Sequence, residues 1–137
     1  MAQPLSLRFT PETIEQLGAR ARRAGLPART LAQPYVEEGL RMDEHPLVRF
    51  LNGPAGRRAA LVGAGPDVWK LVIVIRDNDG DFSAAAEYLE LPLGLVQAGA
   101  AYYGAYRSEI DDWIAASEYE RADAHAAFGA ARAAFGR

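Results

Sequence analysis

Two polar side chains near the N-terminus have the type and spacing that recognition of nucleic-acid bases requires. Ser6 and Arg8 alternate with the apolar residues Leu5, Leu7 and Phe9. Because side chains alternate between the two faces of a strand, this pattern predicts a short strand with one polar and one apolar face. An arginine can donate two hydrogen bonds to O6 and N7 of guanine. The polar face is therefore a candidate surface for reading bases.

The sequence has few side chains of the kinds that usually carry out catalysis. The 137 residues include no cysteine and two isolated histidines, His45 and His125. The sequence patterns of zinc proteases, serine hydrolases and phosphate-binding loops are missing from the sequence. Asp111 and Asp112 are adjacent, so on a helix they point about 100° apart and form no carboxylate pair. We expect a binding protein without cofactor or metal, not an enzyme.

Charge is distributed unevenly along the chain. Residues 1–33 carry five arginines against two acids, a net charge of +3, whereas residues 81–120 carry one arginine against eight acids, a net charge of −7. Affinity for nucleic acid depends on neutralising phosphate charge. Any contact with DNA is therefore expected in the N-terminal third.

Two helices are predicted after the short strand. Thr10 can cap the first helix, Pro11 suits its first turn, and Gly25 ends it. A second helix follows Pro27 and closes near His45. A lone strand is not stable, so it must pair either with a second copy of itself or, as an ordinary edge strand, with the rest of the chain.

One strand followed by two helices, over about residues 4–45, resembles the ribbon-helix-helix domain of Arc and CopG-type repressors. The resemblance implies a homodimer or a higher even oligomer whose paired strands enter the DNA major groove, with Ser6 and Arg8 reading bases. It also implies a phosphate anchor at the start of the second helix, here Arg29 and Thr30. The family usually caps its second helix with Ser or Thr, and the sequence departs from this because the segment 27–30 reads Pro-Ala-Arg-Thr. In addition, Pro34 inside a helix would cost about 3 kcal/mol. A second helix beginning near Leu31 would tolerate Pro34 but would be short.

Turn-forming residues suggest a boundary in the middle of the chain. We expect a DNA-binding and dimerisation segment at 1–46, a linker at 47–56, a small helical domain at 57–114 and a C-terminal tail at 115–137. Residues 68–76 fit either a strand, by the propensity of Val72–Ile75, or a helix starting after Pro66. The acidic stretch 77–81 lacks the glycine and glutamate spacing of a calcium loop, and we expect a solvated turn. Asp81 or Ser83 can cap the helix that follows.

The stretch that ends near residue 114 has two alanine-rich helices with a short break between them, which fits a helix-turn-helix pattern. The carboxylates around the second helix repel the phosphate backbone. We therefore expect this unit to bind a protein or to dimerise. The stretches 57–62, 67–69, 85–89, 100–103 and 109–111 together resemble a small helix-turn-helix-like domain of unknown function that recurs in VapB-type antitoxins, often encoded beside a PIN-like ribonuclease toxin.

The C-terminal segment is rich in alanine and poor in large apolar side chains, so it favours a helix that cannot fold well alone. In VapB-type antitoxins such a tail wraps the toxin. The resemblance implies toxin contacts by aromatic anchors and by arginines that pair with toxin carboxylates. These candidates are Trp113, Tyr119, Arg121, Phe128, Arg132 and Phe135. The alternative is a frayed helix packed on its own domain.

The sequence thus predicts a mainly α protein: a ribbon-helix-helix-like start, a helix-turn-helix-like domain and a helical tail. The beginning of the chain does not resemble a secretion signal, and the longest apolar run is too short to span a membrane, so we expect a cytoplasmic protein. The predicted function is that of an antitoxin that binds a PIN-like ribonuclease toxin and represses its own operon by binding operator DNA. The alternative is a stand-alone dimeric transcriptional regulator without a toxin partner.

Overall fold

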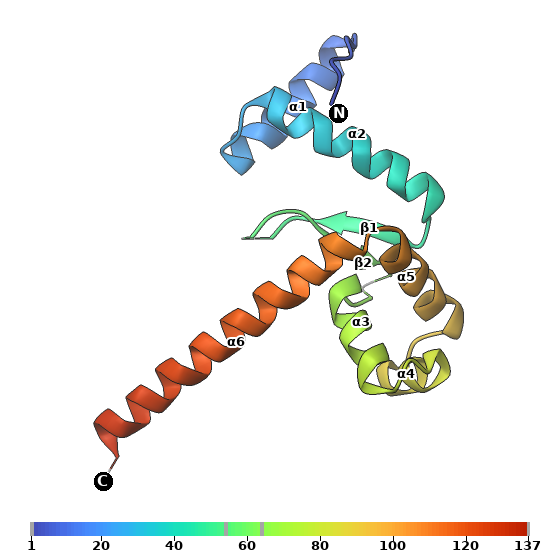
Figure 1. Ribbon diagram of the computed structural model, residues 1–137. Coiled ribbons are helices and arrows are strands. Elements are labelled where there is room, and N and C mark those ends of the chain that lie inside the picture. Colours follow the sequence, from blue (N-terminus) through green and yellow to red (C-terminus); the bar gives the residue numbers. More distant parts are fainter. Residues whose placement is uncertain (1, 54, 64, 137) are drawn as a thin grey trace. The chain divides into compact units, whose positions relative to one another are not determined.

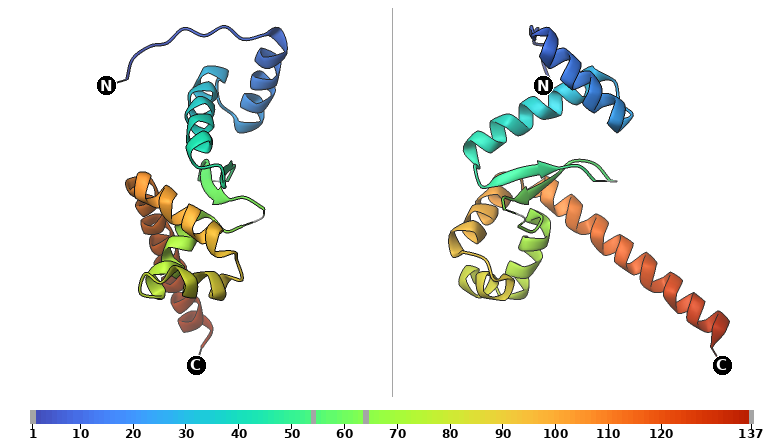
Figure 2. Two further views of the ribbon diagram at one scale, coloured as in Figure 1. Left: turned by 90° about the vertical axis from the view of Figure 1, so that its right-hand side faces the viewer. Right: turned by 180° about the vertical axis from the view of Figure 1, so that it is seen from behind.

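The computed structural model describes residues 2–53, 55–63 and 65–136 and divides them into two compact units, residues 1–44 and 45–137. Within the described residues the chain is mainly helical, with one small antiparallel sheet. No helix in these ranges combines the length and apolar character needed to cross a membrane. Each unit is described separately below (Figures 1 and 2).

Unit 1 consists of two helices, α1 (Pro11–Ala24) and α2 (Ala28–Glu44), which pack against each other. The predicted start of α1 is confirmed, because the Thr10 hydroxyl accepts a hydrogen bond from the Thr13 backbone amide at 3.2 Å. Its predicted end is confirmed as well, since Gly25 has φ of +67°, a left-handed conformation that favours glycine. Helix α2 begins at Ala28 and runs through Pro34, so the start near Leu31 that would have made this helix short is not observed.

The predicted strand over residues 5–9 is not formed in the single chain. Residues 2–10 precede α1 without helix or strand, and the left view in Figure 2 shows them extended. Leu5, Leu7 and Phe9 are all exposed. The sheet formed by the described residues does not include this segment, so the edge-strand alternative finds no support.

Unit 2 begins with a β-hairpin where a linker was expected. Strand β1 (Val48–Leu51) pairs antiparallel with β2 (Arg58–Leu61), in a register that sets Val48 opposite Leu61. The hairpin thus occupies part of the stretch expected to be a linker, 47–56, and the start of the expected helical domain at 57–114. The hairpin is stabilised by burial, because Val48 and the last three residues of β2 belong to the protein interior.

Four helices complete unit 2: α3 (Val68–Asp77), α4 (Phe82–Leu89), α5 (Leu93–Ala105) and α6 (Arg107–Phe135). The ambiguous segment 68–76 is helical, and it buries Val68, Leu71, Val72 and Ile75 along one face. A turn follows α3, as expected, and the Asp81 carboxylate caps α4 by accepting from the Ala84 amide at 3.0 Å.

Helix α3 lies at the centre of unit 2 and packs against α4, α5, α6 and β2. The close approach of α3 and α5 depends on Gly99, because a Cβ atom there would lie 2.2 Å from Cδ2 of the buried Leu71. Tyr102, Ile110 and Ile114 bring α5 and the start of α6 into the same core. The core therefore fixes the first two turns of α6.

Candidate partner-binding site

The C-terminal part of α6 packs against no other described residues of unit 2. Every residue from 118 to 135 is exposed, and the exposed fraction of Phe135 reaches 91%. Figures 1 and 2 show this half of the helix projecting away from the rest of unit 2. The helix continues through the predicted boundary at residue 115 without a break. The alternative of a tail packed on its own domain is not observed.

Local sequence explains why the projecting segment is helical. Alanine has the highest intrinsic helix propensity, and ten of the residues from 115 to 134 are alanines. Glu109 lies in the first turn and Arg132 in the last, where each charge complements the helix dipole. In proteins most helical stability comes from tertiary packing, which the projecting half lacks. The packed root of α6, residues 107–117, is therefore the part of the helix that the fold holds in place.

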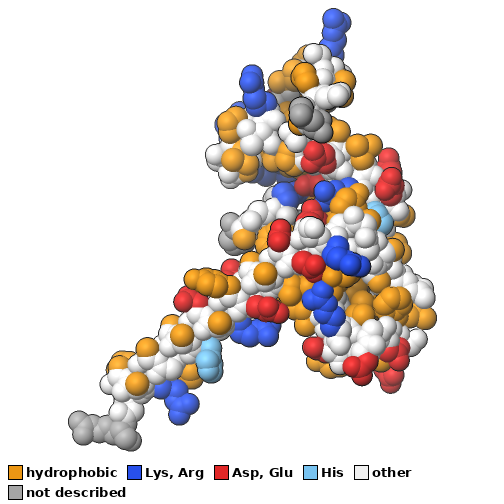
Figure 3. Space-filling model, viewed as in Figure 1, with side chains coloured by type: hydrophobic (Ala, Val, Ile, Leu, Met, Phe, Trp, Pro, Cys, Tyr) orange, Lys and Arg blue, Asp and Glu red, His pale blue; other side chains and the backbone are white. Residues whose placement is uncertain are grey.

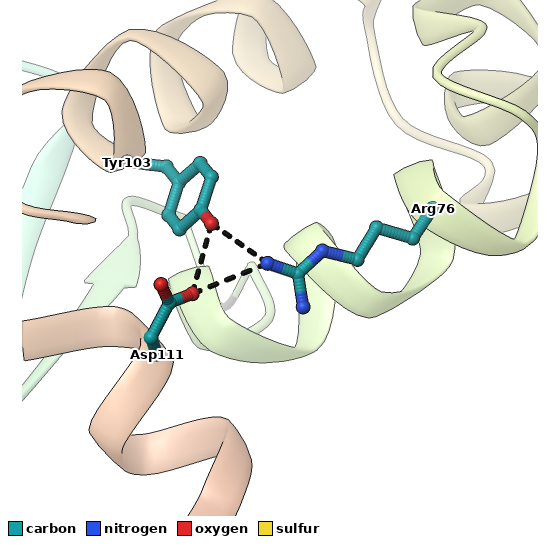
Figure 4. Close-up of polar contacts among 3 residues, drawn as sticks. All are labelled: Arg76, Tyr103 and Asp111. Atoms are coloured by element: carbon teal, nitrogen blue, oxygen red, sulfur yellow. Dashed lines mark hydrogen bonds and ion pairs between the residues drawn. The ribbon is translucent and has the colours of Figure 1, made fainter. Parts of the chain in front are cut away.

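Polar contacts attach the root of α6 to the helices beneath it. The Tyr103 hydroxyl and the Asp111 carboxylate are 2.8 Å apart, and Arg76 Nη2 donates to both, at 2.7 and 3.2 Å (Figure 4). Each residue comes from a different helix, α3, α5 and α6. Burial opposes the charge of Arg76, but the electrostatic effect of Tyr103 and the hydrogen bonds to Asp111 and Tyr103 raise its pKa overall. Arg76 therefore remains charged, and this exposed cluster contributes orientation more than stability.

A second tyrosine reinforces the same junction. The buried Tyr102 donates its hydroxyl hydrogen to Glu109 at 2.7 Å. The Tyr-Tyr and Glu-Ile-Asp stretches singled out in the sequence are thus joined pairwise, Tyr102 to Glu109 and Tyr103 to Asp111, with Ile110 buried between the two acids. Sequence reasoning saw the stretches but did not predict their pairing or the contribution of Arg76.

Helical geometry places the predicted toxin-binding residues on different faces. At 100° per residue, Arg121, Phe128, Arg132 and Phe135 lie within about 60° of one another. Tyr119 lies on the opposite side, and its ring is 75% exposed. Trp113 is half-buried at the root. Figure 3 shows apolar atoms along the projecting helix, interrupted by scattered charged side chains.

The predicted DNA-binding residues all lie in unit 1 and are exposed. Ser6 and Arg8 belong to the extended segment before α1, and Arg29 and Thr30 lie in the first turn of α2. A helix N-terminus directs its free amides and the positive end of its dipole outward, which suits a phosphate. These side chains are available for contact, but the single chain does not join them into one surface.

Unit 1 also leaves many large apolar side chains exposed for its size. They are Leu5, Leu7, Phe9, Ile14, Leu26, Val36, Leu40 and Met42. Its buried apolar residues are Ala21 and Leu31. So small a core falls short of what a unit of about 40 residues needs for independent stability. A second copy that covers these side chains would supply the missing apolar contact.

Within the described ranges, no group of three or more histidine or acidic side chains is arranged to hold a metal ion. Comparison of the chain with models of protein families, with curated proteins and with solved structures found no match. The function is therefore inferred from the surfaces described above.

Proposed function

We propose that this protein is an antitoxin-type regulator whose projecting α6 helix binds and inhibits a PIN-like ribonuclease toxin. The observation that carries the proposal is the projecting half of α6, in which every residue is exposed although the segment has two phenylalanines and two arginines on one face. Aromatic anchors and arginines dominate the energy of protein interfaces. An arginine also forms two-point hydrogen bonds with a carboxylate, the group expected at the acidic centre of such a toxin.

In this proposal unit 1 forms the DNA-binding dimer in the cytoplasm. The exposed apolar residues of its N-terminal segment would pair with those of a second copy, and Ser6 and Arg8 would then face the operator. Arg29 and Thr30 would contact the phosphate backbone. The net charge of −7 over residues 81–120 keeps unit 2 from competing for DNA.

The test is inhibition of the ribonuclease encoded next to this chain, titrated with the full chain and with a chain truncated after Ser117. All the described residues that truncation removes, 118–136, are exposed, so it should leave unit 2 folded but abolish inhibition. Phe128→Ala and Arg132→Ala should each weaken inhibition, by about thirtyfold for the loss of a typical anchor. Tyr119→Ala is the matched control, because it removes an exposed aromatic ring from the opposite face.

Stoichiometric inhibition by the truncated chain would show that α6 is not the inhibitory element. If no ribonuclease is encoded beside this chain, the alternative of a stand-alone dimeric regulator gains support. Its basis is the exposed apolar surface of unit 1, which calls for a second copy whether or not a toxin exists.

A further inference from the structure

A groove of about 440 Å³ opens at the root of α6, entirely within unit 2. One wall is formed by Trp69 and Lys70 at the start of α3, and the other by Trp113, Ala116 and Glu120 of α6. This volume lies in the range of pockets that enclose a small ligand or a side chain. The groove is not part of the α6 face considered above, and both tryptophans of the chain line it.

Hydrogen bonds hold the floor of the groove in place. Asp67 Oδ2 accepts from Nε of Arg58 at 2.7 Å and from the indole nitrogen of Trp69 at 3.1 Å. Arg58 Nη1 also donates to the backbone carbonyl of Asn52 at 2.9 Å. The side chain of Asp67 is only 11% exposed and its charge is balanced by Arg58, so the floor is formed by the chain's own contacts and is internally neutral. A ligand would therefore bind to preformed walls, which reduces the entropic cost of binding.

The lining selects a neutral aromatic group. The charged side chains of the lining balance one another, because Arg58 and Lys70 offset Asp67 and Glu120, so the groove offers no net attraction to a cationic or an anionic group. The Lys70 ammonium already lies 5.4 Å from the centre of the Trp69 ring. Two indole rings beside an alanine instead offer edge and face contacts to another aromatic ring.

The course of α6 indicates where such a ring would come from. Residues 113, 116, 117 and 120 line the groove at spacings of three and four, and the same face continues through Ala124, Ala127 and Ala131. Phe128 and Phe135 border this face. A protein segment lying along the projecting helix therefore reaches the groove at its end. We propose that the groove receives a neutral aromatic side chain of the protein partner that α6 binds. This proposal depends on the proposed function in one respect, namely that α6 binds a protein partner.

The two indole N–H signals of the ¹⁵N-labelled full chain report occupancy directly, because no other tryptophan exists. N-acetylphenylalanine amide, N-acetylleucine amide and N-acetylarginine amide serve as probes of the three side-chain classes. The phenylalanine amide should shift both signals saturably, and the arginine amide should not. Absence of a saturable shift, or tighter binding of the arginine or leucine amide, would overturn the proposal.

Two matched substitutions on α6 show whether the phenylalanine amide binds in the groove. Ala116 and Ala115 are both exposed on α6, but only Ala116 lines the groove. Ala116→Phe should fill the groove and abolish the response to the phenylalanine amide, whereas Ala115→Phe should preserve it. Circular dichroism checks that both variants remain folded. An unchanged response in Ala116→Phe would place the probe elsewhere and refute the assignment.

A separate experiment tests the partner, with the ribonuclease encoded next to this chain as the probe. Ala116→Phe should weaken its binding by about thirtyfold, the effect of losing one aromatic anchor, while Ala115→Phe binds normally. Full affinity in Ala116→Phe would refute the partner-supplied ring. If the ribonuclease binds neither the variants nor the wild-type chain, the proposed function fails, whereas the response to the phenylalanine amide still decides whether the groove accepts an aromatic ring.

Discussion

Gly99 is the position where the packing of unit 2 makes the sharpest quantitative prediction. A Cβ atom at this buried glycine would lie 2.2 Å from Leu71 Cδ2 and 3.2 Å from Leu61 Cδ2, and both leucines are fully buried. Relief of the first contact requires Leu71 to move within a closed core. Such overpacking costs about 1–3 kcal/mol.

Gly104 in the same helix provides the matched comparison. It is exposed, and a Cβ atom there meets nothing within 4 Å. Gly104→Ala should therefore gain only the helix propensity of alanine, about 0.5–1 kcal/mol. Gly99→Ala gains the same propensity but incurs the overpacking cost. The free energies of unfolding of the two variants should thus differ by about 1–3 kcal/mol, with Gly99→Ala the less stable.

Denaturant unfolding followed by tryptophan fluorescence measures this difference. Trp69 and Trp113 both belong to unit 2, so the signal reports that unit and not unit 1. Equal stability of the two alanine variants would refute the reasoning, because it would mean that α3 and α5 can separate at no cost.

Three further predictions concern the units and their assembly. Arg8→Ala should abolish specific operator binding without changing the circular dichroism spectrum, and retained affinity in mobility shifts at fixed salt would rule out base reading by this residue. Light scattering should give at least twice the chain mass of 14.8 kDa, because we propose that a second copy covers the exposed apolar residues of unit 1, and a strict monomer at micromolar concentration would contradict this. A fragment of residues 45–137, which contains the whole of unit 2, should not bind duplex DNA at physiological salt because of its acidic segment, and tight salt-sensitive binding would disprove that expectation.

Helix ends were predictable because they depend on neighbouring residues. Thr10, Gly25 and Asp81 perform the capping roles expected of them. The segment 68–76 was undecided because its β-branched residues favour a strand while its spacing favours a helix. Burial of the helical face from Val68 to Ile75 decided it, since burying several large side chains outweighs a propensity difference of about 1 kcal/mol.

The hairpin was missed for a different reason. Ala59 and Ala60 favour a helix locally, and their strand depends on β1, which lies about ten residues earlier. Residues 58–61 alone do not indicate that they pair with β1. The cluster of Arg76, Tyr103 and Asp111 was missed for the same reason, because its residues come from three helices and meet only in the folded chain.

The junction between α5 and α6 connects the packing of unit 2 to the availability of its projecting helix. Nucleation is the unfavourable step of helix formation, whereas each added residue extends an existing helix at little cost. Ile110 and Ile114 are buried, and the Tyr102–Glu109 and Tyr103–Asp111 contacts hold the first turns in place, so the folded unit supplies the nucleus. The exposed half of α6 can then propagate from that root before any partner arrives. A partner that binds a helix already formed gives up less of its binding free energy to ordering than one that must fold a disordered tail. If α6 binds a partner as proposed, the residues that orient its root contribute to that binding without touching the partner.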